Sequence, residues 1–345
     1  MKRIGWFVII TLTAQWGLAR DPISDEKIGQ IIDQFQYITN YQIDEMALDT
    51  KGSARCLIYD LDLTTDYPGM PDPLKVDGRL YLPNPNRLGG DTVPMVVMLP
   101  PMGGINMLDR RMANTFCDEK IAAYIIMNDF TGVQSGNTPP VDDHDKAFHR
   151  TISALKASLA FANDYEHTNG EKVGLFGVSL GGILGSFSMQ TQAQVAAGFF
   201  IVAGGDVPSI LADSDQEDVT RVRQERMQQE GFNSKAEYEA WLRLHLNYDP
   251  QDLAPSVPTE TVQMVISRDD YHVPTARQVD LHGAFGEPQA YYFNSGHVGT
   301  VIDVLLWESN RLIISDFFKE RFTLENPRVE LARQWLSGFS LGRYF

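Results

Sequence analysis

The stretch KVGLFGVSLGGILG, residues 172–185, contains the pattern G-x-S-x-G with Ser179 at its centre. A strand-like apolar run precedes the pattern and a helix-like run follows it, which is the setting of a nucleophilic serine on a sharp strand-to-helix turn. Gly177 and Gly181 suit that turn because larger side chains would collide there. The string alone has low specificity, since roughly a tenth of random sequences of this length and composition would contain one. A glycine-rich loop with a small serine is the competing interpretation.

A serine hydroxyl needs a general base to become a nucleophile, and His297 is the best placed of the seven histidines. It lies in YYFNSGHVGT, after the last predicted strand and before a predicted helix. We expect His297 to take the proton from Ser179, with a structural turn histidine as the alternative. Capping, surface, loop or insertion positions fit the other six histidines better: His144, His149, His167, His245, His272 and His282.

The histidine in turn needs a carboxylate that orients its ring and stabilises its charged form. The segment TVQMVISRDDYHVP places Asp269 and Asp270 directly after a predicted strand. We prefer Asp270, which is closer to the start of the next predicted helix, and keep Asp269 as the alternate acid. Asp206 in VAGGDVP, after another predicted strand, is a third candidate.

Attack on a carbonyl creates an oxyanion, which needs N–H donors fixed in advance. The amide of Leu180, directly after the nucleophile, is the first expected donor. The second should come from the loop VVMLPPMGGIN. Because Pro100 and Pro101 have no N–H, Met102 or Gly103 is the expected donor, and a simple turn is the alternative reading of the loop.

These residues need a scaffold, and eight short β-type runs provide one. The later runs are continuously apolar, which is typical of strands in a parallel sheet buried on both faces. The first two runs have no helix between them, so we expect an antiparallel hairpin at one edge. The predicted strands are ARCLIYDLDL, GRLYLPN, PMVVMLPP, AAYIIMNDF, KVGLFGV, AAGFFIVAGG, TVQMVISR and QAYYFNS.

Helical patterns alternate with the later strands, which predicts an α/β domain with right-handed crossovers and helices on both faces of the sheet. A further helix is predicted ahead of the strands, over Asp25 to Ala47, from apolar residues at helical spacing. The remaining predicted helices cover residues 108–119, 145–163, 180–190, 219–246, 275–285 and 301–321.

The helical pattern between the sixth and seventh strands is unusually long. Residues 207–255 therefore form an insertion, either a lid over the active face or a peripheral pair of helices. We assign residues 51–322 to the α/β domain, residues 20–50 to an N-terminal helical extension and residues 323–345 to a C-terminal tail.

Taken together, the chain resembles the α/β-hydrolase fold, close to its dienelactone-hydrolase-like and acyl esterase branches. The matching pieces are PPMGG for the oxyanion loop, GVSLGG for the nucleophile turn, RDDYHVP for the acid and SGHVG for the base. The order Ser179, Asp270, His297 is the order of that fold. The resemblance implies acyl transfer through an acyl-enzyme, with no metal and no organic cofactor. Dienelactone hydrolases proper carry Cys at the nucleophile turn and haloalkane dehalogenases Asp, so Ser179 argues against both activities.

The N-terminus MKRIGWFVIITLTAQWGLAR has the pattern of a secretory signal peptide. Two positive residues precede an apolar run that is too short for a comfortable membrane span, and small residues follow it. We expect cleavage after residue 19, export to the periplasm or the extracellular space, and no stable membrane span afterwards. An N-terminal membrane anchor or a buried helix is the alternative interpretation. In such a compartment Cys56 and Cys117 could pair, and two unrelated buried thiols are the alternative.

Composition limits the partners. The chain has 345 residues, 43% of them hydrophobic and 21% charged, with a formal net charge of −16. An acidic surface repels phosphate backbones, so we do not expect a nucleic-acid partner. The sequence carries no signal for an oligomeric state.

The favoured function is an exported serine hydrolase that cleaves a small-molecule carboxylic ester. A serine peptidase and an acyltransferase on the same fold are the nearest alternatives. A non-catalytic binding protein that kept the fold is the alternative from another class, but such proteins usually lose one residue of the triad.

Overall fold

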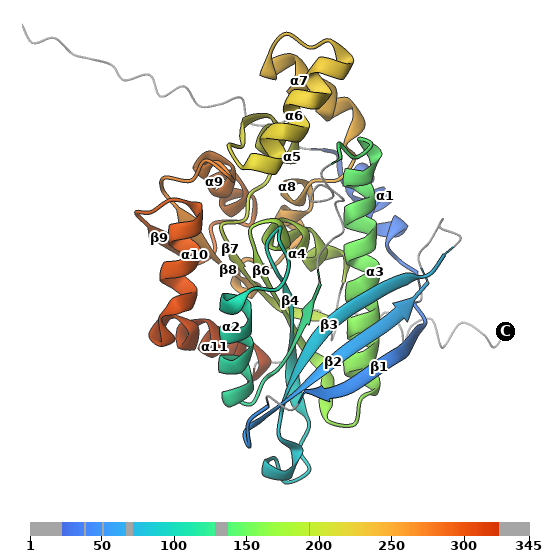
Figure 1. Cartoon of the computed structure of the whole chain (residues 1–345), viewed down its shortest axis with the longest axis vertical. Helices are drawn as coiled ribbons and strands as arrows, with labels where there is room; N and C mark the ends of the chain where they lie inside the picture. Colours follow the sequence, from blue (N-terminus) through green and yellow to red (C-terminus); the bar gives the residue numbers. More distant parts are fainter. Residues whose placement is uncertain are drawn as a thin grey trace, which may run out of the picture.

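The computed structural model describes residues 23–37, 39–49, 52–66, 72–127, 137–192 and 194–323. The expected signal peptide and nearly all of the expected C-terminal tail lie outside these residues. Within them, nine strands form one sheet in the order β1-β2-β3-β5-β4-β6-β7-β8-β9 (Figure 1). The strands are β1 Tyr41–Asp49, β2 Cys56–Thr65, β3 Leu74–Pro83, β4 Val93–Leu99, β5 Ala122–Ile126, β6 Thr168–Val178, β7 Val195–Ile201, β8 Val262–Ser267 and β9 Ala290–Phe293.

The sheet is parallel from β5 to β9, and β1, β2 and β3 join it antiparallel at one edge. The predicted mostly parallel sheet and the predicted antiparallel β2–β3 pairing are therefore confirmed. The central strand β4 shows why the apolar runs are continuous. Met95, Val97 and Leu99 face one hydrophobic core, whereas Val96 and Met98 face the core on the other side of the sheet.

The prediction of one helix over Asp25 to Ala47 is wrong for the second half of that range. Helix α1 covers Asp25–Gln34, and the chain then forms the ninth strand, β1, which pairs with β2 from Tyr41 opposite Thr65 onward. Strand β1 lies at the edge of the sheet and none of its residues is fully buried, so its sequence YQIDEMALD has no clear two-residue alternation. Its Glu, Met, Ala and Leu favour helix in isolation, and pairing with β2 overrides that preference.

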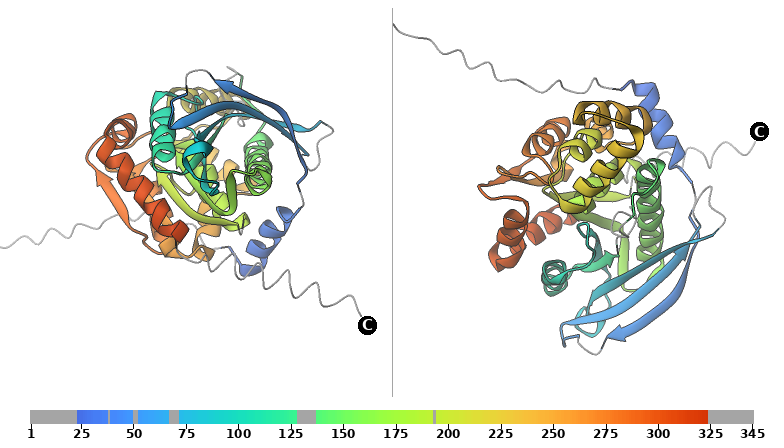
Figure 2. Two further views of the ribbon diagram at one scale, coloured as in Figure 1. Left: turned by 90° about the horizontal axis from the view of Figure 1, so that it is seen from below. Right: turned by 45° about the horizontal axis from the view of Figure 1, so that its top comes forward.

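Helices cover both faces of the sheet, as predicted (Figures 1 and 2). Helices α2, α10 and α11 pack on one face and α3, α4 and α9 on the other. Their bounds are α2 Met107–Asp118, α3 Asp142–Asp164, α4 Leu180–Thr191, α9 Thr275–Ala284, α10 His297–Leu306 and α11 Glu308–Thr323. The single helix predicted over residues 301–321 is thus two helices, because Trp307 between them has extended backbone angles.

The insertion between β7 and β8 contains α5 Val207–Asp213, α6 Glu217–Glu230, α7 Lys235–His245 and α8 Pro250–Leu253. The one helix predicted over residues 219–246 is interrupted at Gly231, whose φ of 75° ends α6. The insertion lies beyond the carboxyl ends of the parallel strands, above α4 in the view of Figure 1. It therefore covers the end of the sheet at which Ser179 stands.

Cys56 and Cys117 form a disulfide with their Cα atoms 5.9 Å apart. The bond joins β2 to α2, so the antiparallel edge is covalently linked to a helix of the parallel part. Among the described helices, none is both long enough and apolar enough to cross a membrane.

Candidate active site

Ser179 stands on a strained turn between β6 and α4. Its φ of 55° and ψ of −120° lie in a region that side-chain-bearing residues rarely adopt. The two flanking glycines make the turn feasible. A Cβ on Gly177 would lie 2.5 Å from the carbonyl oxygen of Gly181, and a Cβ on Gly181 would lie 2.0 Å from the carbonyl oxygen of Leu99. The glycine-rich pattern is thus required by close backbone packing, and it holds the serine at the end of the sheet.

His297 contacts Ser179, although the two residues are 118 positions apart in the sequence. It is the first residue of α10, and its Nε2 lies 2.9 Å from Ser179 Oγ. Its Nδ1 lies 2.7 Å from Asp270 Oδ2. The side chain of Asp270 is fully buried and that of His297 is 11% exposed, so the chain of contacts is largely shielded from water. The structure therefore brings together the three residues singled out from the sequence as Ser, His and Asp.

Asp270 is held by donors on several sides. Its Oδ1 accepts hydrogen bonds from the backbone N–H groups of His272 and Val273 at 2.9 and 3.0 Å. Its Oδ2, the oxygen that contacts His297, also accepts a hydrogen bond from Gln278 Nε2 at 2.7 Å. This network fixes the carboxylate so that one oxygen points at the histidine. Gln278 was not predicted as a site residue, because a glutamine on a helix carries no sequence signal for such a contact.

Neither of the two alternate acids contacts His297. Asp269 is exposed, and the hydrogen bond to His297 comes from its neighbour. Asp206 is fully buried and forms ion pairs with Arg243 and Arg277 at 2.8 and 2.9 Å. Burial would raise the pKa of Asp206, but Arg243, Ser209 and Arg277 outweigh it and hold this pKa below its usual value. Asp206 thus ties α7 of the insertion to α9.

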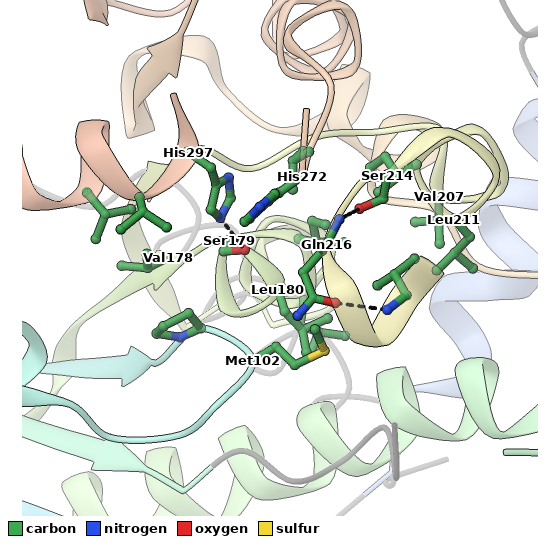
Figure 3. A pocket seen from close by; sticks show the side chains of 18 of the residues that line it. Met102, Val178, Ser179, Leu180, Val207, Leu211, Ser214, Gln216, His272 and His297 are labelled. Atoms are coloured by element: carbon green, nitrogen blue, oxygen red, sulfur yellow. Dashed lines mark hydrogen bonds between the residues drawn. The ribbon is translucent and has the colours of Figure 1, made fainter. Parts of the chain in front are cut away.

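The predicted oxyanion loop borders the same site. Pro101 and Met102 line the pocket next to Ser179, and Leu180 lines it from the first turn of α4 (Figure 3). Gly103 and Gly104 follow with φ values of 125° and 76°, which favour glycine. Of the predicted donors, Leu180 and Met102 thus border the pocket together with Ser179, and Gly103 directly follows Met102 in the chain.

A pocket of about 420 Å³ opens at Ser179. Its walls are mostly apolar and come from α3, α4, α5 and α10, with the insertion closing one side. Such a cavity suits a small organic molecule with an apolar part. Its volume and lining could not be predicted, because they depend on how the insertion packs against α3.

Two further histidines, His144 and His272, line the pocket, although surface, loop or cap positions were predicted for them. His272 stands beside the base, with the centres of the His272 and His297 rings 4.9 Å apart. Burial and the nearby Arg226 lower the pKa of His144 to about 4, so this ring is neutral at pH 7. Both rings therefore border the cavity in which a substrate would bind, in addition to His297.

No family model and no curated protein sequence matches this chain. Solved structures do match it. An acetyl xylan esterase from Paenibacillus sp. R4 has a TM-score of 0.64 at 13% identity and covers 87% of this chain and 95% of its own. Acetyl xylan esterase 1 from Thermoanaerobacterium sp. JW/SL YS485 has a TM-score of 0.61 at 15% identity, over 86% of this chain and 93% of its own.

An acylaminoacyl peptidase from Pyrococcus horikoshii also matches, with a TM-score of 0.50 at 13% identity over 81% of this chain and 50% of its own. At these identities the similarity establishes the fold. The sheet order, the helices on both faces and these neighbours together show that the chain has the α/β-hydrolase fold.

Proposed function

We propose that this α/β-hydrolase-fold protein is an exported serine hydrolase that cleaves a carboxylic ester through an acyl-enzyme. The observation that carries the proposal is the hydrogen-bonded chain from Ser179 through His297 to Asp270, with distances of 2.9 and 2.7 Å. A binding protein that merely kept the fold would have no need to maintain this chain. The similar acetyl xylan esterases add support for an ester as substrate.

In the proposed first step, Ser179 Oγ attacks the ester carbonyl while His297 Nε2 takes its proton. Asp270 holds the ring with Nδ1 protonated and stabilises the imidazolium that forms. The carbonyl oxygen becomes an oxyanion, which the backbone N–H of Leu180 and that of Met102 or Gly103 stabilise. His297 then gives its proton to the leaving alkoxide, so an alcohol departs and an acyl-serine remains.

In the second step a water molecule attacks the acyl-serine. His297 takes a proton from the water and returns it to Ser179 Oγ when the carboxylic acid leaves. The mostly apolar pocket limits the access of other water to the site, which strengthens the electrostatic contribution of the oxyanion donors.

Export is the second part of the proposal. The signal-like pattern of residues 1–19 and the Cys56–Cys117 disulfide both support an oxidising compartment outside the cytoplasm. N-terminal sequencing of the exported protein should begin near Arg20. An exported fraction that begins at Met1 would contradict this part alone.

Reaction of the purified protein with a fluorophosphonate probe and with p-nitrophenyl esters tests the catalytic part. The wild type should be labelled at Ser179 and should release p-nitrophenol, whereas Ser179→Ala should do neither while keeping its thermal transition. A matched p-nitroanilide should be cleaved more slowly than the ester. Unlabelled wild-type protein, or a Ser179→Ala variant with full turnover, would overturn the proposal, and faster cleavage of the anilide would favour a peptidase.

A further inference from the structure

Gln216 lies immediately before α6, where the insertion meets the pocket. Its Oε1 accepts a hydrogen bond from the backbone N–H of Val219 at 2.8 Å, and its own backbone N–H donates to Ser214 Oγ at 3.2 Å. Only the oxygen of the side-chain amide can accept from an N–H, so the identity of its two ends is fixed. The remaining end is Nε2, which carries two N–H donors.

Gln216 borders the same pocket as Ser179, and its Nε2 end lies on the pocket side of the insertion. Figure 3 shows the side chain descending from the insertion toward Leu180 and Met102, the residues beside which the oxyanion would form. Among the described residues, no acceptor hydrogen-bonds to Nε2. A wholly apolar substrate would strip water from these donors without replacing its hydrogen bonds, which carries a cost in free energy.

The position of His297 decides which part of an ester lies on which side. The leaving oxygen must receive its proton from His297 Nε2, so the alcohol part belongs on the side of α10. That side is lined by Val298, Val301 and Ile302. Val298 and Ile302 are 57% and 41% exposed, so this side opens to solvent.

The acyl part therefore points away from α10, toward the side closed by α3, α4 and the insertion. That side is lined by Phe148, Ile183, Val207 and Ile210, each at most 9% exposed. Gln216 borders this enclosed side from the insertion, as Val207 and Leu211 do (Figure 3). An acyl chain thus meets an apolar wall that carries two fixed N–H donors.

We propose that Gln216 is a specificity-determining residue whose Nε2 donates a hydrogen bond to an acceptor oxygen within the acyl chain of the substrate. The enzyme would then prefer short acyl groups that carry an ether, hydroxyl or carbonyl oxygen over alkyl groups of equal length. This inference rests on the proposed ester hydrolysis and names the acyl class that the same site takes.

Two esters of equal chain length test the inference: p-nitrophenyl methoxyacetate and p-nitrophenyl butyrate. They differ by one ether oxygen in place of a methylene, and an ether oxygen only accepts hydrogen bonds, so the pair reports on a donor in the enzyme. The measured quantity is kcat/KM for the methoxyacetate divided by kcat/KM for the butyrate. This ratio is then divided by the ratio of their rates with hydroxide, taken in the same order. This division removes their difference in intrinsic reactivity.

Two variants separate the effect of the Nε2 donors of Gln216 from the effect of its Oε1 as the cap of α6. In Gln216→Glu a carboxylate oxygen can still accept from the Val219 N–H, but the Nε2 donors are gone. Gln216→Leu removes both the acceptor for the Val219 N–H and the Nε2 donors. We expect the normalised ratio to fall about fivefold in each variant at pH 8, since a neutral hydrogen bond contributes about 1 kcal/mol. Leu211→Ala, a control on the same wall, should change kcat/KM for both esters alike and keep the wild-type ratio.

A wild-type ratio in Gln216→Glu or in Gln216→Leu would overturn the inference and leave the proposed function intact, provided that butyrate is still hydrolysed. A ratio that changes equally in Leu211→Ala would also overturn it, because the effect would then be one of pocket shape. Failure of the wild type to hydrolyse either ester would overturn the proposed function, and the inference with it.

Discussion

Gln278 Nε2 donates to Asp270 Oδ2 at 2.7 Å, and this is the same carboxylate oxygen that contacts His297. Gln278 lies in α9 and is fully buried. Its Nε2 also donates to the carbonyl oxygen of Val273, and its Oε1 accepts from the backbone N–H of Ser267 at 3.0 Å. The side chain of Gln278 thus connects the end of β8, the turn that carries Asp270, and helix α9.

Replacement of Gln278 by Leu should weaken both folding and turnover. The change leaves the Ser267 N–H without its acceptor and frees one side of Asp270, so we expect the free energy of unfolding to fall by about 2–3 kcal/mol. It should also lower kcat about tenfold through poorer orientation of His297, with KM nearly unchanged, because Gln278 does not line the pocket. Urea unfolding and steady-state kinetics measure the two effects, and an unchanged kcat would show that the backbone donors alone position Asp270.

Exchange of each of the two adjacent aspartates for Asn should identify the acid. Asp270→Asn replaces the acceptor that faces His297 Nδ1–H by an amide, which favours the wrong tautomer of the ring. We expect kcat/KM for a p-nitrophenyl ester to fall on the order of 10³–10⁴-fold. Asp269→Asn is the matched control on an exposed side chain and should stay within about twofold of the wild type. A large loss in Asp269→Asn with a small one in Asp270→Asn would reverse the assignment.

The residues at the centre of this site were easier to predict from the sequence than the residues that form the walls of the pocket. Ser179 and Asp270 lie between a strand and the following helix, and His297 follows a strand and begins a helix, so all three lie near strand ends that meet at one edge of a parallel sheet. Short-range pattern therefore sufficed to single out Ser179 and His297, whereas it favoured Asp270 but kept Asp269 and Asp206 as alternatives. The same logic placed the parallel strands, because apolar runs such as that of β4 report burial on both faces.

What the sequence did not reveal depends on contacts between distant segments. Strand β1 reads as helix until β2 is beside it. Gln216 reaches the pocket only because the insertion packs over it, and Gln278 meets Asp270 only because α9 packs against the end of β8. The local sequence of neither residue signals a pocket or a carboxylate partner. The pairing of Cys56 with Cys117 likewise required the distance between β2 and α2.

Alanine substitutions at two helical glycines should have opposite effects. In Gly181→Ala the new Cβ would lie 2.0 Å from the carbonyl oxygen of Leu99, and backbone must move to relieve this contact. We expect loss of several kcal/mol of stability and of most activity, since the movement displaces Ser179. Gly283→Ala in α9 has no atom within 4 Å of the new Cβ, so it should stabilise the protein by about 0.5–1 kcal/mol. Thermal unfolding of both variants checks the contrast, and equal transitions would contradict it.

Acidification should destabilise the protein partly through His144. Its pKa is about 4 in the folded state and near 6.5 when unfolded, because burial and Arg226 disfavour the charged ring. Above pH 6.5 the ring is neutral in both states and has no effect. Between pH 6.5 and 4 the unfolded chain binds the proton and the folded protein does not, so the free energy of unfolding falls as the pH falls, by about 3 kcal/mol in all.

His144→Gln isolates this contribution. The wild type should lose about 2 kcal/mol more than the variant between pH 7 and pH 4.5 in denaturant titrations. Burial raises the pKa of Asp109 to about 6, which acts in the opposite direction, but it does so in both proteins and cancels in the difference. Equal pH dependence in the two proteins would mean that His144 binds a proton while folded.

Loss of the disulfide should lower stability without changing the chemistry of the site. Cys56 and Cys117 are 61 residues apart, and the loop that their bond closes is expected to contribute about 4 kcal/mol by restricting the unfolded chain. The double variant Cys56→Ser, Cys117→Ser should therefore unfold at a lower temperature and keep wild-type kcat/KM below that transition, because the bond lies on β2 and α2 away from the Ser179–His297 contact. Reductant should shift the transition of the wild type and leave that of the double variant in place. Two free thiols in the unreduced, denatured wild type would show that the pair does not form.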